Sequence, residues 1–238
     1  MEVYLSRVLK LLVFDLDGTL ADTGSDLAVS VNQALSLVGH SPLPLDTLIG
    51  FLGDGAQTLI TRSLMASGDG ETSAGEIESA LESFLEHYRD HCLGATKVYP
   101  GLIASLESLS GRRKAVLTNK PDEPARRILA GLGLAGHFVH VVGGDNPYGK
   151  KPDPTALKHI MEAEGVLPEE TLMIGDGLQD LKVARRAGAR FLGFTGGMAP
   201  QAALLRENPE SVFQDMSALP KAVAALEAGI DQQPGSRP

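Results

Sequence analysis

The sequence predicts an α/β fold, a doubly wound parallel sheet that carries an inserted, all-helical domain. Short apolar runs of strand length recur along the chain, and helical patterns separate the later runs. One long stretch, 21–96, shows helical spacing without a convincing strand. Strands that alternate with helices are typical of β-α repeats around a parallel sheet, and the odd stretch indicates an insertion.

The apolar runs give the expected strands of the sheet. The first run, LLVF, leads directly into the acidic stretch DLDGT. Continuous apolar runs are typical of strands that are covered on both faces. The expected strands are residues 11–14, 115–117, 138–142, 171–174 and 191–194.

Helical patterns link the later strands, and most open near a proline or an acidic residue. The expected helices lie near 121–133, 153–165 and 177–188. Each pattern ends at a glycine, which is a common helix stop. These glycines are Gly133, Gly165 and Gly188.

The stretch 21–96 is expected to form an all-helical insertion. Its apolar residues recur at helical spacing, as at Leu27 and Val31. The remaining parts, 1–20 and 97–238, are expected to form the α/β core.

Turn-forming and polar segments separate these parts. Residues 67–75 read as a polar loop between two helices of this insertion, and Tyr99-Pro100-Gly101 marks the return to the core. The last residues, 231–238, are expected to be a frayed tail.

The composition restricts the class of protein. The 238 residues are 43% hydrophobic, with 27 Gly and 14 Pro, which suits a globular α/β protein with many tight turns. The formal net charge is -9 without a basic run, so we expect neither a nucleic acid nor a membrane as partner. The N-terminal stretch fits neither a signal peptide nor a membrane span. With a single cysteine, Cys92, an internal disulfide is excluded, and we expect a cytoplasmic protein.

Two pairs of carboxylates follow expected strands. Asp15 and Asp17 come directly after the first strand, and Asp176 and Asp180 follow the strand at 171–174. In open α/β sheets, ligands bind beyond the carboxyl ends of the strands. Alternation points the first two carboxylates roughly the same way, so a proton or a cation must offset their repulsion. Hard oxygen ligands, without histidine or thiolate, suit Mg²⁺.

Groups that bind phosphate follow two further strands. KAVLTNKP presents Thr118 and Asn119, and GGDNPYGKKPDP presents Lys150 and Lys151. Hydroxyl, amide and ammonium groups bind phosphate oxygens. Pro152 biases Lys151 toward an extended backbone, which favours Lys151 over Lys150 as the fixed cation.

Together these residues indicate phosphoryl transfer through a covalent aspartyl-phosphate. Asp15 is the expected nucleophile. Asp17 is expected to protonate the leaving alcohol and then deprotonate the attacking water, a role typically worth about 10²–10⁴-fold. Thr118, Asn119 and Lys151, with the metal, are expected to hold and neutralise the phosphoryl oxygens.

Four motifs follow one another along essentially the whole chain. They are Asp15-Leu16-Asp17-Gly18-Thr19, Thr118-Asn119-Lys120, Lys151-Pro152-Asp153-Pro154 and Gly175-Asp176-Gly177-Leu178-Gln179-Asp180. In this order they resemble the haloacid dehalogenase superfamily of phosphatases. The resemblance implies a Rossmann-like core with strand order 5-4-1-2-3 and a helical cap inserted after the first motif. It also implies Mg²⁺ bound by Asp15, the Asp17 backbone carbonyl and Asp176, with Asp180 acting nearby or through water.

Within this superfamily the chain is most similar to phosphoglycolate phosphatases, through FLGDGAQTLITRSL, VLTNKP, GGDNPYGKKPDP and FTGG. The similarity implies a small phosphorylated metabolite as substrate, with 2-phosphoglycolate first. A phosphatase of a sugar phosphate or of pyrophosphate and a β-phosphoglucomutase-like phosphomutase stay open. A non-catalytic phosphoaccepting signalling domain is a remote alternative, because Asp17 and the cap favour turnover. One departure is Gly177, where relatives usually carry Ser.

Candidate substrate contacts also occur in the cap. The turn at Gly53, Asp54 and Gly55 either starts a helix or presents backbone amides to the substrate. Arg62 lies on the next helix, where it either meets a substrate carboxylate or is solvated.

Three features stay open. His87 and His91 are spaced i and i+4, but HYRDH lacks the Glu of metalloproteases, so a metal pair is not favoured. The turn at 195–197 either skirts the site or is a plain turn. The protein is expected to be a monomer or a homodimer.

Overall fold

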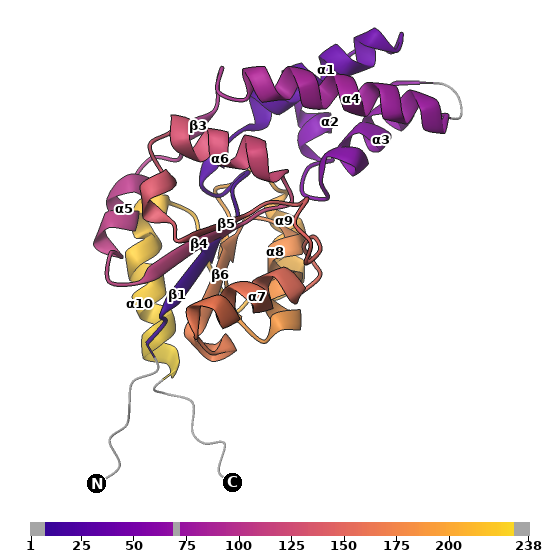
Figure 1. The fold of residues 1–238 in the computed structure, drawn as a ribbon. Helices are drawn as coiled ribbons and strands as arrows, with labels where there is room; N and C mark the ends of the chain where they lie inside the picture. The colour runs from indigo at the N-terminus through magenta and orange to yellow at the C-terminus, as the bar shows by residue number, and fades with distance from the viewer. Residues whose placement is uncertain (1–7, 69–71, 231–238) are drawn as a thin grey trace, which may run out of the picture.

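The chain folds into an α/β core with a helical cap at one end. The structure is a computed structural model and describes residues 8–68 and 72–230. The core is a parallel sheet of six strands with helices on both faces, and the cap overhangs one end of it (Figure 1). The expected tail at 231–238 and the middle of the expected loop at 67–75 lie outside the described residues.

The sheet confirms the predicted doubly wound topology. Its strands are β1 (Leu11–Phe14), β4 (Arg113–Leu117), β5 (His140–Val142), β6 (Thr171–Gly175), β7 (Arg190–Phe194) and β8 (Ser211–Phe213). The spatial order is β5-β4-β1-β6-β7-β8. From β1 the chain adds β4 and β5 on one side and then β6, β7 and β8 on the other. Read from β7 to β5, and numbered along the chain, this is the expected order 5-4-1-2-3. The strand β8 is an additional strand beside β7.

The additional edge strand, β8, was not expected from the sequence. It contributes Ser211, Val212 and Phe213, and pairs in parallel with β7. Only Phe213 is buried. A three-residue strand with one buried side chain has neither an apolar run nor a clear alternation, so the pattern could not reveal it.

Core helices cover both faces of the sheet. They are α5 (Leu102–Ser108), α6 (Asp122–Gly131), α7 (Thr155–Glu164), α8 (Leu178–Ala187), α9 (Gln201–Arg206) and α10 (Leu219–Ile230). Single 3₁₀ turns occur at η1 (Ala135–His137), η2 (Pro168–Glu170) and η3 (Met216–Ala218). The helices expected near 121–133, 153–165 and 177–188 are confirmed as α6, α7 and α8.

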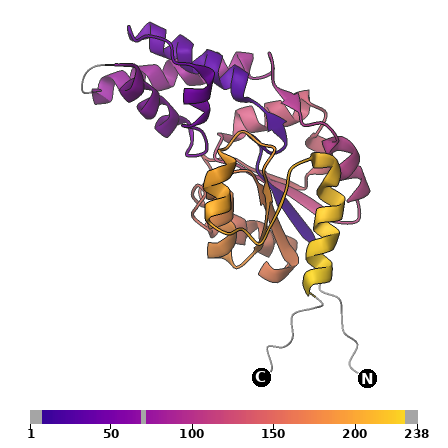
Figure 2. The ribbon, with the colours of Figure 1, turned by 180° about the vertical axis from the view of Figure 1, so that it is seen from behind.

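Alternation along β1 explains the two apolar layers. Leu12 and Phe14 join the cluster formed with α5, α6 and α10, whereas Leu11 and Val13 join the cluster formed with α7 and α8. Figures 1 and 2 show these helix sets on opposite faces. All four β1 side chains are fully buried, and each such burial stabilises the fold by about 1.5–3 kcal/mol. The strand is therefore a rigid base for the residues that follow it.

The cap consists of α1 (Gly24–Leu37), α2 (Leu45–Ile49), α3 (Ala56–Ser67) and α4 (Ala74–His91). Its longest helix, α4, begins at a capping box, in which Ser73 Oγ accepts the Glu76 N–H at 3.2 Å. The inner face of α4 buries Ala80, Phe84 and Tyr88 against the other cap helices and the core. The cap is thus an amphipathic bundle with one face turned to the core.

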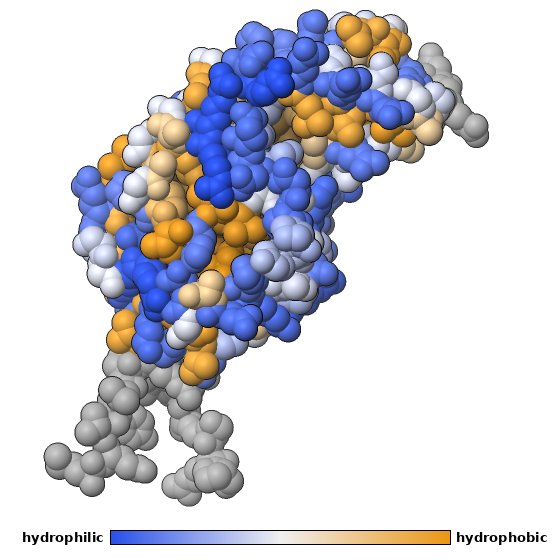
Figure 3. Space-filling view, viewed as in Figure 1, coloured by the Kyte–Doolittle hydropathy of each residue, from blue (hydrophilic) through white to orange (hydrophobic). Residues whose placement is uncertain are grey.

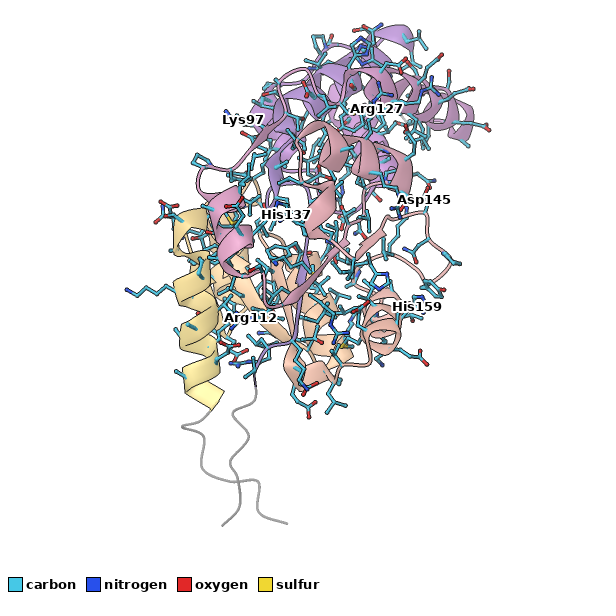
Figure 4. All side chains as sticks on the ribbon, turned by 60° about the vertical axis from the view of Figure 1, so that its left-hand side comes forward. Lys97, Arg112, Arg127, His137, Asp145 and His159 are labelled. Carbon is cyan, nitrogen blue, oxygen red and sulfur yellow. The ribbon has the colours of Figure 1, made fainter. Side chains whose placement is uncertain are left out.

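A short antiparallel ribbon joins the cap to the core. It pairs β2 (Ala21–Asp22) with β3 (Lys97–Val98), and Lys97 lies at this junction in Figure 4. The prediction that 21–96 contains no strand is therefore wrong at its first two residues, because a two-residue strand has no periodic signature. Beside the ribbon, the Asp26 carboxylate accepts the backbone N–H groups of Ala95 and Thr96, which ties the two ends of the insertion together.

A helix that crosses a bilayer must be long and predominantly apolar, and the helices of the described residues do not meet this requirement.

Candidate active site

Three carboxylates meet at the carboxyl edge of the sheet. Asp15 follows β1, Asp176 follows β6, and Asp180 lies in the first turn of α8. One oxygen from each lies within 4.8 Å of the others, and within the described ranges no other group of three or more potential metal ligands is as close. This edge lies where the strand order reverses, between β1 and β6, so the fold itself places the site.

Lys151 holds two of these carboxylates together. Its ammonium Nζ lies 2.8 Å from Asp15 Oδ1 and 2.6 Å from Asp180 Oδ1, and its side chain is only 2% exposed. Burial opposes the charged form, but Asp15 and Asp180 outweigh it and raise the pKa of Lys151 to about 12. Lys150 is exposed, and it approaches the cap at Gly55 instead. The preference for Lys151 over Lys150 as the fixed cation therefore agrees with the structure.

The positive charge of Lys151 does not fully offset the negative charges of the three carboxylates. Burial, followed by the Asp180 charge, raises the pKa of Asp15 to about 8 despite Lys151. The same two causes raise the pKa of Asp176 to about 7. The set offers only oxygen ligands, and a divalent cation would supply the missing positive charge. The residues present therefore fit a hard metal ion.

Asp176 is oriented by a loop that follows β7. The backbone N–H groups of Met198 and Ala199 both donate to Asp176 Oδ2 at 2.9 Å, and Thr19 Oγ1 donates to Oδ1 at 3.3 Å. At Gly197, a Cβ would collide with the Gly18 carbonyl oxygen and the Asp176 side chain. The turn at 195–197 thus skirts the site, which was one of its two open readings.

The Asp17 side chain has partners other than those of the three carboxylates. Its Oδ1 accepts the Thr23 hydroxyl at 2.5 Å and lies 3.1 Å from Lys120 Nζ. The backbone turn after Asp17 requires Gly18, because its φ of 78° lies in the left-handed region and a Cβ there would collide with the Asp176 side chain. The Asp17 side chain is outside the metal-binding group, so any metal contact falls to its backbone carbonyl, which stays a prediction.

Lys120 ends the motif Thr118-Asn119-Lys120, and the sequence alone indicates no role for it. It is buried, and its Nζ contacts both Asp17 Oδ1 and the hydroxyl of Tyr88 at 2.8 Å. Burial opposes its charge, yet Asp17 and Tyr88 raise its pKa above the ordinary value. A lysine after Thr-Asn reads as an ordinary loop residue, and only the cap contact reveals its place.

Thr118 and Asn119 lie at the end of β4 and line the site. Thr118 Oγ1 accepts the Lys120 N–H at 3.2 Å. Asn119 Nδ2 donates to the Gly53 carbonyl at 2.8 Å and to the Lys151 carbonyl at 2.9 Å. Both of its N–H groups are therefore used by the protein and link the cap loop to the core, while its role in binding phosphate stays a prediction.

Asp180 combines two contacts that the sequence left open. Its Oδ1 meets Lys151, and its Oδ2 accepts the Gly177 N–H at 3.0 Å. The second contact caps the start of α8. Asp180 therefore stabilises the first turn of the helix and also lies in the site. Its proximity to Asp15 and Asp176 leaves metal binding, direct or through water, as a prediction.

The cap loop reaches the core through its own polar groups. Asp54 accepts the Gln179 amide, and its other oxygen lies 2.7 Å from Arg62 Nη1. Gly53 and Gly55 both have positive φ, of 105° and 89°. Arg62 is thus paired with Asp54 in the structure, while its prediction as a partner of a substrate carboxylate is untested.

The histidine pair of α4 has an ordinary explanation. The rings of His87 and His91 stack with centroids 4.0 Å apart. His87 Nδ1 meets Ser30 Oγ at 2.9 Å, and His91 Nδ1 meets the His87 carbonyl at 2.8 Å. Neither ring belongs to a cluster of potential metal ligands in the part of the chain that the structure describes.

A cavity of about 1030 Å³ lies between the cap and the core. Its core wall includes Asp15, Asp17 and Asp176, and its cap wall includes residues of α3 and α4. The space-filling view shows the cap overhanging the core, with hydrophilic surface between apolar patches (Figure 3). The arrangement places the carboxylates of Asp15 and Asp17 and the ammonium of Lys120 in the wall of one cavity.

Comparisons with known proteins agree with this geometry. Residues 12–194 match the family model described as haloacid dehalogenase-like hydrolase. A phosphoglycolate phosphatase of Psychrobacter arcticus is 35% identical over 215 residues, covering 88% of this chain and 94% of that protein. Phosphoglycolate phosphatase 1 of Pseudomonas aeruginosa is 36% identical over 220 residues, covering 90% and 79%. A crystal structure of a predicted phosphoglycolate phosphatase from Haemophilus somnus has a TM-score of 0.85 at 29% identity, covering 91% of this chain and 98% of that chain.

Proposed function

The chain belongs to the haloacid dehalogenase-like hydrolases and is a phosphatase, and on this premise we propose that it hydrolyses 2-phosphoglycolate through a phosphorylated aspartate. The observation that carries the proposal is the placement of Asp15, whose Oδ1 is held by Lys151 at 2.8 Å beside Asp176 and Asp180. The names of the two relatives support the choice of substrate.

Asp15 is suited to act as the nucleophile. Its Oδ1 accepts the Leu16 N–H at 2.7 Å and meets Lys151, while Oδ2 has no protein hydrogen-bond partner among the described residues. In the first step an Asp15 oxygen forms a bond to phosphorus, and the bond from phosphorus to the leaving oxygen breaks. Lys151 offsets charge on the phosphoryl oxygens as this happens.

Asp17 supplies and removes protons. Its carboxylic acid gives a proton to the leaving oxygen, so that an alcohol departs. It then accepts a proton from water as the water oxygen bonds to phosphorus and the bond to Asp15 breaks, which restores the Asp15 carboxylate and releases inorganic phosphate. The hydrogen bond from Thr23 and the ion pair with Lys120 hold Asp17 in position for both steps.

Mg²⁺ is the cofactor in this proposal. Asp15, Asp176 and the Asp17 backbone carbonyl would hold it, with Asp180 beside them, and it would supply positive charge for the phosphoryl oxygens. The fit rests on the oxygen-only ligands and on the raised pKa values of Asp15 and Asp176.

We also place the enzyme in the cytoplasm with a small phosphorylated metabolite as its partner. Cys92 is a buried free thiol, which suits a reducing compartment. Enclosure of the cavity by the cap supports a small molecule rather than a protein or polymer substrate.

A panel of phosphomonoesters tests the proposal. With Mg²⁺ present, kcat/KM should be highest for 2-phosphoglycolate when compared with hexose phosphates and pyrophosphate. Inorganic phosphate should appear in equal amount to the substrate consumed. A phosphomutase would instead return the phosphoryl group to a sugar, and phosphate release far below substrate loss would exclude the proposed hydrolysis.

A further inference from the structure

The cavity between the cap and the core has three cations in its wall. They are Arg62, Arg89 and Lys120. Arg62 is 43% exposed in its side chain and already paired with Asp54, and Arg89 is 52% exposed and lies 3.5 Å from Asp90. Lys120 differs from both, because only 3% of its side chain is exposed.

The ammonium of Lys120 has donor capacity to spare. Two of its three N–H groups are accounted for by Asp17 Oδ1 at 3.1 Å and Tyr88 Oη at 2.8 Å. No third partner occurs within the described ranges 8–68 and 72–230. A buried ammonium with a free N–H in a cavity wall is suited to accept an anion.

Tyr88 adds a second unused donor. Its hydroxyl accepts from Lys120, and its own O–H reaches no acceptor among the residues that the structure describes. The ring is held by stacking on Phe84, with centroids 5.5 Å apart, and by the Lys120 ammonium 4.3 Å from its centroid. Tyr88 comes from cap helix α4 and Lys120 from the core, so the pair exists only where the two domains meet.

Acidic residues of α4 disfavour an anion along other parts of the cap wall. Glu78, Glu82 and Glu86 of α4 also line the cavity, and they would repel a carboxylate elsewhere along the cap. In the proposed mechanism the leaving oxygen must lie within hydrogen-bond reach of the Asp17 carboxylic acid to receive its proton. In 2-phosphoglycolate one methylene group separates that oxygen from the carboxylate, so the carboxylate must lie close to Asp17 as well.

We propose that Lys120 Nζ and Tyr88 Oη form the subsite for the carboxylate of the leaving group, and so select 2-phosphoglycolate over neutral phosphomonoesters. This inference rests on the proposed function. It assigns carboxylate recognition to a buried pair at the domain boundary instead of to Arg62, whose guanidinium is engaged by Asp54.

The test compares two substrates of equal size in matched variants. Lys120→Met is assayed with 2-phosphoglycolate and with its amide, in which a neutral carbamoyl group replaces the carboxylate. We expect kcat/KM for 2-phosphoglycolate to fall at least tenfold more than kcat/KM for the amide. Tyr88→Phe should shift the preference in the same direction by a smaller factor, and Lys120→Arg should restore part of it.

Arg89→Met is the matched control, because it removes a positive charge from the same cavity next to Tyr88 in the sequence. It should change the preference between the two substrates less than threefold. The subsite is overturned if Lys120→Met and Tyr88→Phe lower both substrates equally, or if Arg89→Met shifts the preference as much as Lys120→Met. Wild-type protein that hydrolyses other phosphomonoesters but not 2-phosphoglycolate would contradict the proposed substrate and the subsite together, whereas equal losses in an active wild-type background contradict the subsite alone.

Discussion

The sheet edge and the cap wall face the same cavity, yet they are built differently. At the sheet edge, Asp15, Asp176 and Lys151 are held by short contacts from strands and loops of the core. The cap wall combines buried side chains, such as Tyr88, with exposed charged ones, such as Glu82 and Arg62. From this difference we expect substitutions at the sheet edge to affect the chemical steps and substitutions in the cap wall to affect substrate choice.

Described contacts between the two regions at the cavity are few and specific. Asn119 reaches the Gly53 carbonyl, Gln179 reaches Asp54, and Lys120 reaches Tyr88. Substitutions in the core should therefore stop turnover, whereas substitutions at these contacts should change substrate binding more than chemistry.

The largest effect in this comparison is expected for Asp17→Asn. The amide keeps the size of the side chain but cannot transfer the protons, so kcat should fall by about 10²–10⁴-fold. Steady-state kinetics with saturating Mg²⁺ measure this. The cap variant Asp46→Asn removes an exposed carboxylate outside the cavity and should keep kcat within about twofold.

Near-normal turnover by Asp17→Asn would contradict the proton-transfer role. A large loss of Mg²⁺ affinity with little change in kcat at saturating metal would instead reassign Asp17 as mainly a ligand.

A second prediction concerns the stability of the metal-free core. Burial raises the pKa of Asp15 to about 8 and that of Asp176 to about 7, from ordinary values of 3.8. The folded state then keeps protons that the unfolded state releases, so the free energy of unfolding falls as the pH rises from about 4 to about 8. Thermal unfolding in a chelator should show a Tm that decreases across this window.

Mg²⁺ should raise the Tm most at the upper end of that window, because it binds the ionised carboxylates. Asp176→Asn removes one of the shifted groups and should make the decrease shallower. A metal-free Tm that is flat or rises in wild type, with no difference in Asp176→Asn, would contradict the crowded-carboxylate account.

The smallest effect is expected for Asn119→Ala, which removes the hydrogen bond to Gly53 in the cap loop together with the one to the Lys151 carbonyl. One such bond contributes about 0.5–1.5 kcal/mol, so we expect KM to rise by about 2–10-fold with a smaller change in kcat. Gln179→Ala removes the neighbouring hydrogen bond to Asp54 and should raise KM by a similar factor. If Asn119→Ala alone lowers kcat by a hundredfold, its amide contacts the phosphoryl group, as the sequence suggested.

The sequence predicts the core better than the cap for a physical reason. A strand such as β1 is marked by its own apolar run, and the parallel topology brings Asp15, Thr118 and Asp176 to one edge without further information. These predictions use only local patterns and one rule about sheets.

Contacts between distant segments leave no such local mark. The Lys120–Tyr88 pair joins residues 32 positions apart. Met198 reaches Asp176 through a loop for which the sequence left two alternatives open, contact with the site or a plain turn. The strands β2, β3 and β8 were missed because two or three residues cannot show a period. The packing of the cap and of the loops on the sheet edge therefore could not be predicted from the sequence.

The central claim is that Asp15 takes the phosphoryl group, and rapid acid quench during turnover tests it most directly. Mass spectrometry of the quenched protein should place one phosphoryl group on the peptide that contains Asp15, and none should form in Asp15→Asn. A phosphorylated residue elsewhere, or Asp15→Asn that turns over at the wild-type rate, would contradict the account.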